Sequence, residues 1–274
     1  MLRIRAAAVA LIALFVGASF SYAGEAPFKK KAQGVQQADR VALVIGNSNY
    51  VGNAYLRNPA NDADAMERAL KLLNFTVIKQ TDADLAGMED AVLSFRRALK
   101  KGSVGFFFYA GHGIQVKGEN FLVPVSARMR EEFEVKRQCL ELATVLEAMA
   151  ESESNLKIVV LDCCRDDPFK RSWSRSTSGG GLAAVSSVPE GTVIAYSTSP
   201  DKTAEDGTGR NSPYTENLVK VLNTRPVTGL ELTDTFREAS REVKRQTGQV
   251  PWLNMEASLD KYYLWSVTDG DVVK

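Results

Sequence analysis

Two side chains of this chain have the right types to perform nucleophilic chemistry together. The sequence contains one histidine, His112, and three cysteines, of which Cys164 lies in the charged run DCCRDD. A thiol is mostly protonated near neutral pH, so it needs a base to become a nucleophile. Imidazole can take that proton and later donate it to a leaving amine. His112 and Cys164 are therefore the minimum set of a cysteine peptidase.

Both residues directly follow apolar runs that are typical of buried strands. Residues 103–110 (SVGFFFYA) precede His112, and residues 156–162 (LKIVVLD) precede Cys164. The carboxyl ends of parallel strands meet at one edge of a sheet, where ligands of such folds bind. We therefore expect the imidazole and the thiol to converge at that edge.

Strand alternation decides which adjacent cysteine is the candidate nucleophile. It places Asp162 and Cys164 on one face of the strand and Cys163 on the other. Asp162 needs a polar setting, so we expect Cys164 to share that setting and Cys163 to pack into the core. The alternative is that both are small buried hydrophobic residues, as most unpaired cysteines are. Cys139, which we place on a helix, is expected to be a core residue.

The glycines beside His112 favour a functional role for it. Gly111 and Gly113 allow unusual backbone angles and the close approach of a ligand. The backbone N–H groups of Gly113 and Cys164 are candidate donors to an oxyanion. The alternative is a core or turn histidine. A Ser–His–Asp arrangement would also need His112, but the chain has no GxSxG motif to supply its serine.

Strands and helices alternate along the rest of the chain. The expected strands are 40–46, 75–80, 103–110, 156–162 and 191–197, and the expected helices are 60–73, 84–100, 138–150, 212–223 and 230–246. Residues 113–125 read as a hairpin that turns at Lys117–Asn120. This pattern predicts an α/β fold with a mostly parallel sheet and helices on both faces.

Composition excludes several classes of function. The chain has 274 residues, with 34 Lys+Arg and 33 Asp+Glu, a net charge of +1, so no basic surface for nucleic acid is implied. One histidine excludes a two-histidine zinc site. Three cysteines without a CxxC pair exclude a disulfide framework and a four-cysteine metal site.

Residues 1–23 have the pattern of a secretory signal peptide. Two arginines precede an apolar run from Ala6 to Phe20, and small residues follow at Ser21 and Ala23. We expect an exported, periplasmic or secreted protein. The alternative is an uncleaved membrane anchor, although the run is short for a span of about 20 residues. Residues 24–39 read as a polar linker, and residues 40–267 as one domain.

Eight segments together resemble one family. A strand ending in His-Gly, followed about 50 residues later by a strand ending in Asp-x-Cys, is similar to the caspase-like clan of cysteine peptidases. The whole set resembles the metacaspase branch and its bacterial orthocaspases. The matching segments are RVALVIGNSNY (40–50), LRNPANDA (56–63), FFFYAGHG (106–113), GENFLVPV (118–125), VVLDCCRDDPF (159–169), IAYSTSP (194–200), DGTGRNSPYTENL (206–218) and GQVPW (248–252).

The resemblance implies a caspase-like three-layer α/β/α sandwich with a six-stranded sheet. It also implies a cysteine endopeptidase that uses His112 and Cys164 and cleaves protein or peptide substrates after Arg or Lys. Asp62 and Asp162 would line the pocket for that residue, and Ser197 the substrate groove. Two carboxylates in one pocket repel unless a cation lies between them, and a guanidinium can bind a carboxylate with two hydrogen bonds. The alternative for Asp62 is an acid at a helix N-terminus.

Other features of the resemblance concern processing and metals. Residues 170–181 (KRSWSRSTSGGG) follow the nucleophile in a region where related peptidases are often cut. Lys170, Arg171 and Arg175 are therefore candidate self-cleavage sites, the alternative being a basic loop without that role. Many metacaspases need calcium, but no loop of clustered Asp and Gly stands out here. We expect neither calcium dependence nor another metal or cofactor.

Two other functions stay open. One is a non-catalytic caspase-like module that binds a basic peptide without cutting it. The other is a clan relative with Asn-specific or transpeptidase-like activity, against which the two acids of the expected pocket argue.

Overall fold

The computed structural model describes residues 39–164, 182–185, 188–200, 207–224, 226, 229–256 and 259–265, and for Asn53 and Cys164 it describes the main chain alone. All of these ranges belong to one structural unit, residues 37–274.

The unit is built on a mixed sheet whose main path has six strands in the order β2-β1-β3-β6-β7-β9. Neighbouring strands of the path are parallel except for the antiparallel pair β7 and β9. A hairpin extends β3 into β4, which pairs with β5. The strands are β1 (Arg40–Gly46), β2 (Thr76–Thr81), β3 (Val104–Val116), β4 (Glu119–Leu122), β5 (Leu140–Glu141), β6 (Leu156–Cys164), β7 (Thr192–Tyr196) and β9 (Trp252–Met255).

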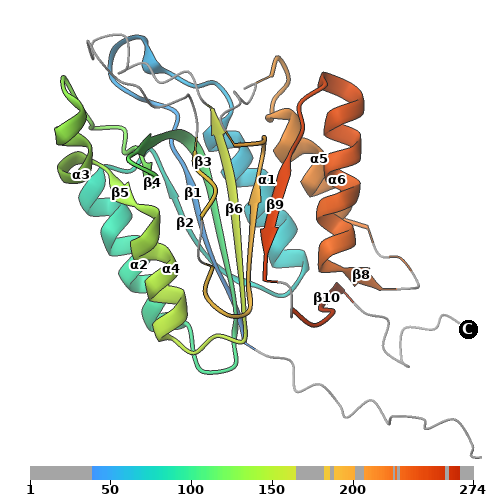
Figure 1. The fold of residues 1–274 in the computed structure, drawn as a ribbon. Helices are drawn as coiled ribbons and strands as arrows, with labels where there is room; N and C mark the ends of the chain where they lie inside the picture. Colours follow the sequence, from blue (N-terminus) through green and yellow to red (C-terminus); the bar gives the residue numbers. More distant parts are fainter. Residues whose placement is uncertain are drawn as a thin grey trace, which may run out of the picture. The chain divides into compact units, whose positions relative to one another are not determined.

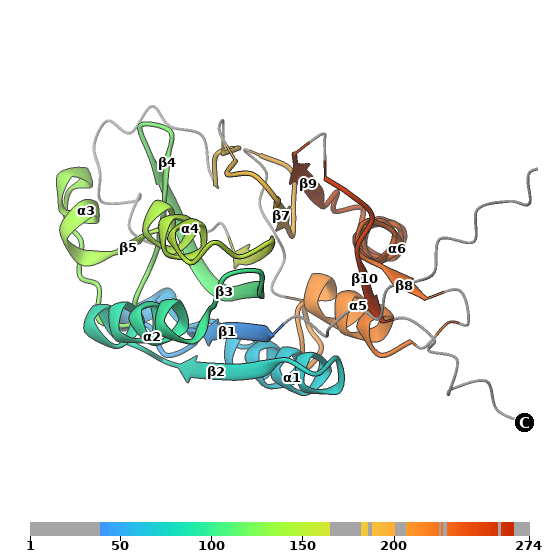
Figure 2. The same ribbon diagram turned by 90° about the horizontal axis from the view of Figure 1, so that it is seen from below.

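Helices cover both faces of this sheet (Figures 1 and 2). One face packs against α1 (Pro59–Leu72), α5 (Pro213–Leu222) and α6 (Leu232–Thr247), and the other against α2 (Leu85–Ala98) and α4 (Leu142–Glu151). Phe106 and Phe108 of β3 belong to the first core, and Phe107 and Tyr109 to the second. Because both faces are buried, the part of β3 from Val104 to Ala110 contains no charged residue and is rich in aromatic side chains. The predicted three-layer α/β/α sandwich with a mostly parallel six-stranded sheet is confirmed.

Two predicted boundaries were wrong near the hairpin. The third strand does not end at residue 110 but continues through His112 to Val116, because its second half pairs with β4. The turn is shorter than predicted and centres on Lys117 and Gly118, with φ of +52° and +86°. Positive φ at both central residues is typical of a tight hairpin turn.

The helix predicted over 138–150 is interrupted. The short helix α3 (Val135–Gln138) ends there, β5 follows, and α4 begins at Leu142. Cys139 therefore lies in extended backbone rather than on a helix, because the chain next to it pairs with β4. Its predicted place in the core is confirmed, with its Sγ 3.5 Å from Met129 Sδ.

The carboxyl-terminal strands were not predicted. Residues 230–231 form β8 (Leu230–Glu231), which pairs with β10 (Tyr263–Trp265) rather than starting α6. The Arg40 guanidinium donates hydrogen bonds to the carbonyls of Leu73 and Leu264, so β10 lies near the start of β1. The short helices η1 (Gly52–Ala54) and η2 (Glu132–Glu134) complete the described elements. Within the described part of the chain, no helix combines the length and apolar character needed to span a bilayer.

Candidate active site

The sheet brings the two candidate catalytic positions side by side. β3 and β6 are paired in parallel, with His112 opposite Cys164 and Ala110 opposite Asp162. Neighbouring strands lie about 4.8 Å apart. The two strand ends that the sequence predicts to be neighbours are therefore adjacent, and their register places the two residues at the same level.

The His112 imidazole is buried and oriented by a backbone carbonyl. Its Nε2 lies 2.7 Å from the Ala54 carbonyl oxygen. A carbonyl oxygen can only accept, so Nε2 carries the proton and Nδ1 is the nitrogen that can take a proton from a thiol. The Tyr50 ring lies against the imidazole, with centroids 4.4 Å apart and planes inclined by 57°.

Two tyrosine hydroxyls hold the main chain of His112. Its N–H donates to Tyr50 Oη at 2.8 Å, and its carbonyl oxygen lies 2.8 Å from the Tyr109 hydroxyl. The same carbonyl accepts from the Val123 N–H at 3.0 Å. The sequence analysis did not predict these partners of His112. The only signal for Tyr109 is a hydroxyl at the end of an otherwise apolar strand.

The glycines that flank His112 are needed for packing. Gly111 has φ of +154°, and a Cβ there would lie 2.4 Å from Tyr50 Oη and 2.7 Å from Tyr109 Oη. At Gly113 a Cβ would lie 2.9 Å from Leu182 Cδ2 and 3.1 Å from Cys163 Sγ. The unusual backbone expected beside His112 is present at Gly111. The oxyanion role of the Gly113 and Cys164 amides stays a prediction.

Asp62 and Asp162 are both buried and meet at the N-terminus of α5. The Ser212 N–H donates to Asp62 Oδ1 at 3.0 Å, and the Ser212 hydroxyl donates to Asp162 Oδ2. Asn211 Nδ2 adds a bond of 2.8 Å to Asp62 Oδ1, and the Thr215 hydroxyl one of 2.6 Å to Asp162 Oδ2. The structure therefore brings together two acids that are 100 positions apart in the sequence.

The N-terminus of α5 provides a favourable electrostatic setting for these carboxylates. Ser212 is the N-cap, and its Oγ accepts from the Thr215 N–H at 2.9 Å. The partial positive charge of a helix N-terminus stabilises nearby anions. Burial and, to a lesser extent, the Asp162 carboxylate raise the pKa of Tyr214 well above its usual range. Ser212 followed by Pro213 is a helix-start signal, but it does not reveal the contact with either acid.

A family model described as "Caspase domain" matches residues 39–263. The chain belongs to the caspase-domain family. A caspase domain supports a caspase-like protease or a related function, and caspase-like proteases act on protein substrates.

Two curated relatives match part of this chain. They are the mucosa-associated lymphoid tissue lymphoma translocation protein 1 of Homo sapiens and its homolog in Mus musculus. These are 38% and 37% identical over 127 residues, which is 46% of this chain. The match covers 15% of the length of each relative. The predicted membership in a caspase-like cysteine peptidase family is confirmed.

The contacts of the remaining candidate residues do not point to a role in catalysis or substrate binding. Cys163 is buried, as predicted, in the core between the sheet and helices α2 and α4. Ser197 is also buried: its N–H donates to the Leu161 carbonyl at 2.9 Å, and its carbonyl accepts from Gln249 Nε2. Its substrate role stays a prediction. The self-cleavage candidates Lys170, Arg171 and Arg175 lie outside the described residues of this caspase domain.

Acidic residues elsewhere in the caspase domain have structural partners. The Glu134 carboxylate accepts hydrogen bonds from the backbone N–H groups of Arg130 and Glu131, which lower its pKa. This bond pattern caps η2. Over the parts of the chain that the structure describes, no group of three or more His, Cys, Asp or Glu is placed to hold a metal ion.

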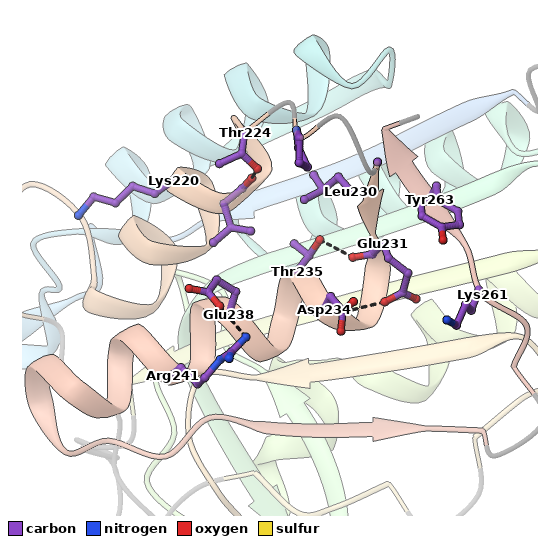
Figure 3. Close-up of a pocket in the computed structure, with 13 residues that line it drawn as sticks. Lys220, Thr224, Leu230, Glu231, Asp234, Thr235, Glu238, Arg241, Lys261 and Tyr263 are labelled. Carbon is purple, nitrogen blue, oxygen red and sulfur yellow. Dashed lines mark hydrogen bonds and ion pairs between the residues drawn. The ribbon is translucent and has the colours of Figure 1, made fainter. Parts of the chain in front are cut away.

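A cavity of about 690 Å³ lies between β8, β10 and the ends of α5 and α6 (Figure 3). Its charges are largely paired. Arg241 binds Glu238, and Glu231 accepts from the N–H of Asp234 at the start of α6. No predicted site residue of the caspase domain lines this cavity.

Proposed function

We propose that this caspase domain is a cysteine endopeptidase that cleaves protein substrates after Arg or Lys. The observation that carries the proposal is the register of β3 and β6, which sets His112 opposite Cys164. The Ala54 carbonyl supports the same proposal, because it fixes the tautomer in which Nδ1 can act as a base.

The reaction proceeds in two steps through a thioester. Nδ1 of His112 takes the Cys164 proton, and the thiolate attacks the scissile carbonyl carbon. The C–N bond then breaks as the imidazolium gives its proton to the leaving amine. In the second step His112 deprotonates a water that attacks the thioester, and the thiol leaves with that proton. The Gly113 and Cys164 amides would stabilise the oxyanion in both steps.

The preference for Arg or Lys rests on Asp62 and Asp162. Both carboxylates reach the same helix N-terminus, where Ser212 contacts each of them. Bringing two acids together is unfavourable, and a substrate cation beside them relieves the repulsion. The sequence motifs favour the metacaspase and orthocaspase branch. We include in this proposal export by residues 1–23, a domain over 40–267, and self-cleavage within residues 170–181.

The first test measures hydrolysis of fluorogenic peptides that end in Arg, Lys, Asp or Asn. The full chain is assayed under reducing conditions, with and without calcium, beside Cys164→Ala. Asp162→Asn is expected to lower kcat/KM for the Arg peptide about 10- to 100-fold, since a hydrogen bond to a charged group contributes about 1.5–3 kcal/mol. Asp64→Asn is the matched control, because Asp64 is a half-exposed acid that pairs with Lys79.

Each outcome of this assay has a defined meaning. Cleavage after Arg or Lys that Cys164→Ala abolishes supports the dyad and the acidic pocket together. Cleavage after Asp or Asn alone overturns the pocket and keeps the dyad. No turnover by folded, reduced protein, with binding of a basic peptide, favours a non-catalytic module. Self-cleavage is refuted if a chain carrying Lys170→Gln, Arg171→Gln and Arg175→Gln still yields the same fragments.

A further inference from the structure

We propose that Tyr50 is a positioning residue for His112, acting on the histidine through both its hydroxyl and its ring. Its predicted effect on catalysis rests on the proposed peptidase function, whereas its effect on the histidine does not. Tyr50 comes from the loop 47–56, between β1 and α1, about 60 positions before His112 in the sequence.

The Tyr50 hydroxyl lies at the centre of a buried polar cluster. It is 2.8 Å from the His112 nitrogen, 3.2 Å from Tyr109 Oη and 3.2 Å from the Val123 carbonyl oxygen. His112 N–H must donate, so Tyr50 Oη accepts there. Its own proton can then be donated to the Val123 carbonyl oxygen or to Tyr109 Oη.

Tyr109 completes the cluster from the strand itself. Its hydroxyl lies 2.8 Å from the His112 carbonyl and 2.9 Å from the Val123 carbonyl. Burial raises the pKa of Tyr109 well above its usual range, so this hydroxyl keeps its proton near neutral pH and can donate it. The two adjacent tyrosine hydroxyls thus contact the N–H and the carbonyl of His112.

The loop that carries Tyr50 also carries the carbonyl that orients the ring. Tyr50 and Ala54 are four residues apart, and one binds the His112 main chain while the other binds Nε2. The loop is itself fixed, because the N–H groups of Ser48 and Asn49 both donate to Asp82. The loop therefore sets the position of the imidazole relative to β6, because Tyr50 binds the main chain of β3 at His112 while Ala54 binds the ring.

Removing the Tyr50 hydroxyl while keeping its ring isolates this role. In Tyr50→Phe the His112 N–H loses its acceptor in a buried setting, which is costly and is relieved by movement of the strand. We expect kcat to fall at least 10-fold with KM within 2-fold. Tyr196→Phe is the matched control, since Tyr196 is a buried tyrosine on β7 that packs against Trp252. It is expected to leave kcat unchanged.

The single histidine of the chain permits a readout that does not depend on activity. Protein labelled with ¹⁵N-histidine, without a histidine tag, gives one backbone amide signal and two ring nitrogen signals. In the unmodified protein we expect protonated Nε2, unprotonated Nδ1 and a backbone amide protected from hydrogen exchange at least 100-fold. In Tyr50→Phe the ring signals should shift toward mixed tautomers and the amide protection should fall at least 10-fold.

Three outcomes would overturn the proposal. The first is Tyr50→Phe with unchanged kcat and unchanged ring signals, even if its stability falls, because that marks a structural role only. The second is a loss in Tyr196→Phe equal to that in Tyr50→Phe. The third is rapid exchange of the His112 amide in the unmodified protein, which decides the matter even if the variant does not fold. If the unmodified protein cleaves no peptide, the proposed function fails, and the ring signals still test the positioning.

Discussion

Replacing Gly111 by alanine tests whether the tyrosine pair really constrains the backbone at His112. Gly111 has φ of +154°, a conformation that costs a residue with a side chain about 1–3 kcal/mol. The new Cβ would also lie 2.4 Å from Tyr50 Oη and 2.7 Å from Tyr109 Oη. These atoms end rigid, buried rings, so they cannot move aside easily, and overpacking adds about 1–3 kcal/mol. We expect Gly111→Ala to lower the free energy of unfolding by about 2–6 kcal/mol.

Gly118→Ala separates the two causes. Gly118 also has a positive φ, +86°, but a Cβ there meets nothing within 4 Å. This variant should lose about 1–2 kcal/mol, from backbone strain alone. Urea unfolding of both variants, followed by circular dichroism, gives the comparison. If Gly111→Ala is no less stable than Gly118→Ala, the two hydroxyls do not lie close to Gly111. The packing described above for the residues around His112 would then be refuted.

Two further predictions concern stability elsewhere in the domain. Ser212→Ala should lower the free energy of unfolding by about 2–4 kcal/mol, because it removes the cap of α5 and a hydrogen bond to the buried Asp162. The control Asp84→Ala, at the exposed cap of α2, should lower it by about 1 kcal/mol. Equal losses in urea unfolding would argue against a special role for Ser212. Lys71 and Lys79 lower the pKa of Glu67, so this carboxylate stabilises the fold above its ordinary pKa, and that contribution disappears as the pH falls through the lowered value. A chain with Lys71→Met and Lys79→Met should therefore lose less stability between pH 7 and pH 3 than the unmodified chain. The difference between the two losses should be under about 1 kcal/mol, because the ion pairs are partly exposed. An identical pH dependence of the two chains would contradict this.

Local patterns in the sequence are enough to predict the sheet and the pairing of its two chemically important strands. The runs that form β1, β3 and β6 are apolar on both faces, which follows from burial between two helical layers. His112 and Cys164 each lie just beyond such a run, so their adjacency follows from the parallel arrangement. β9 and β10 could not be predicted in this way, since they are short and only partly buried, and depend on pairing with distant strands.

The supports of the site could not be predicted because they come from distant parts of the chain. Tyr50 reaches His112 across 62 positions, and Ser212 reaches Asp62 across 150. Neither residue type carries a local signal for such a contact. The surroundings of Cys139 were also not predictable from local sequence. The helical periodicity of residues 138–150 continues across the point where pairing with β4 interrupts the helix.

Two sets of described residues therefore support the site. His112 depends on the loop 47–56 and on Tyr109, whereas Asp62 and Asp162 depend on the first residues of α5. If the proposed peptidase function holds, a change in the first support should alter proton transfer and lower kcat. A change in the second should alter the binding of a basic side chain and raise KM. Since Tyr50 binds His112 whereas Ser212 binds the two acids, the free-energy effects of Tyr50→Phe and Ser212→Ala on kcat/KM should add, as they do for independent sites. A large departure from additivity would mean that the strand ends of β3 and β6 transmit strain between the two halves of the site.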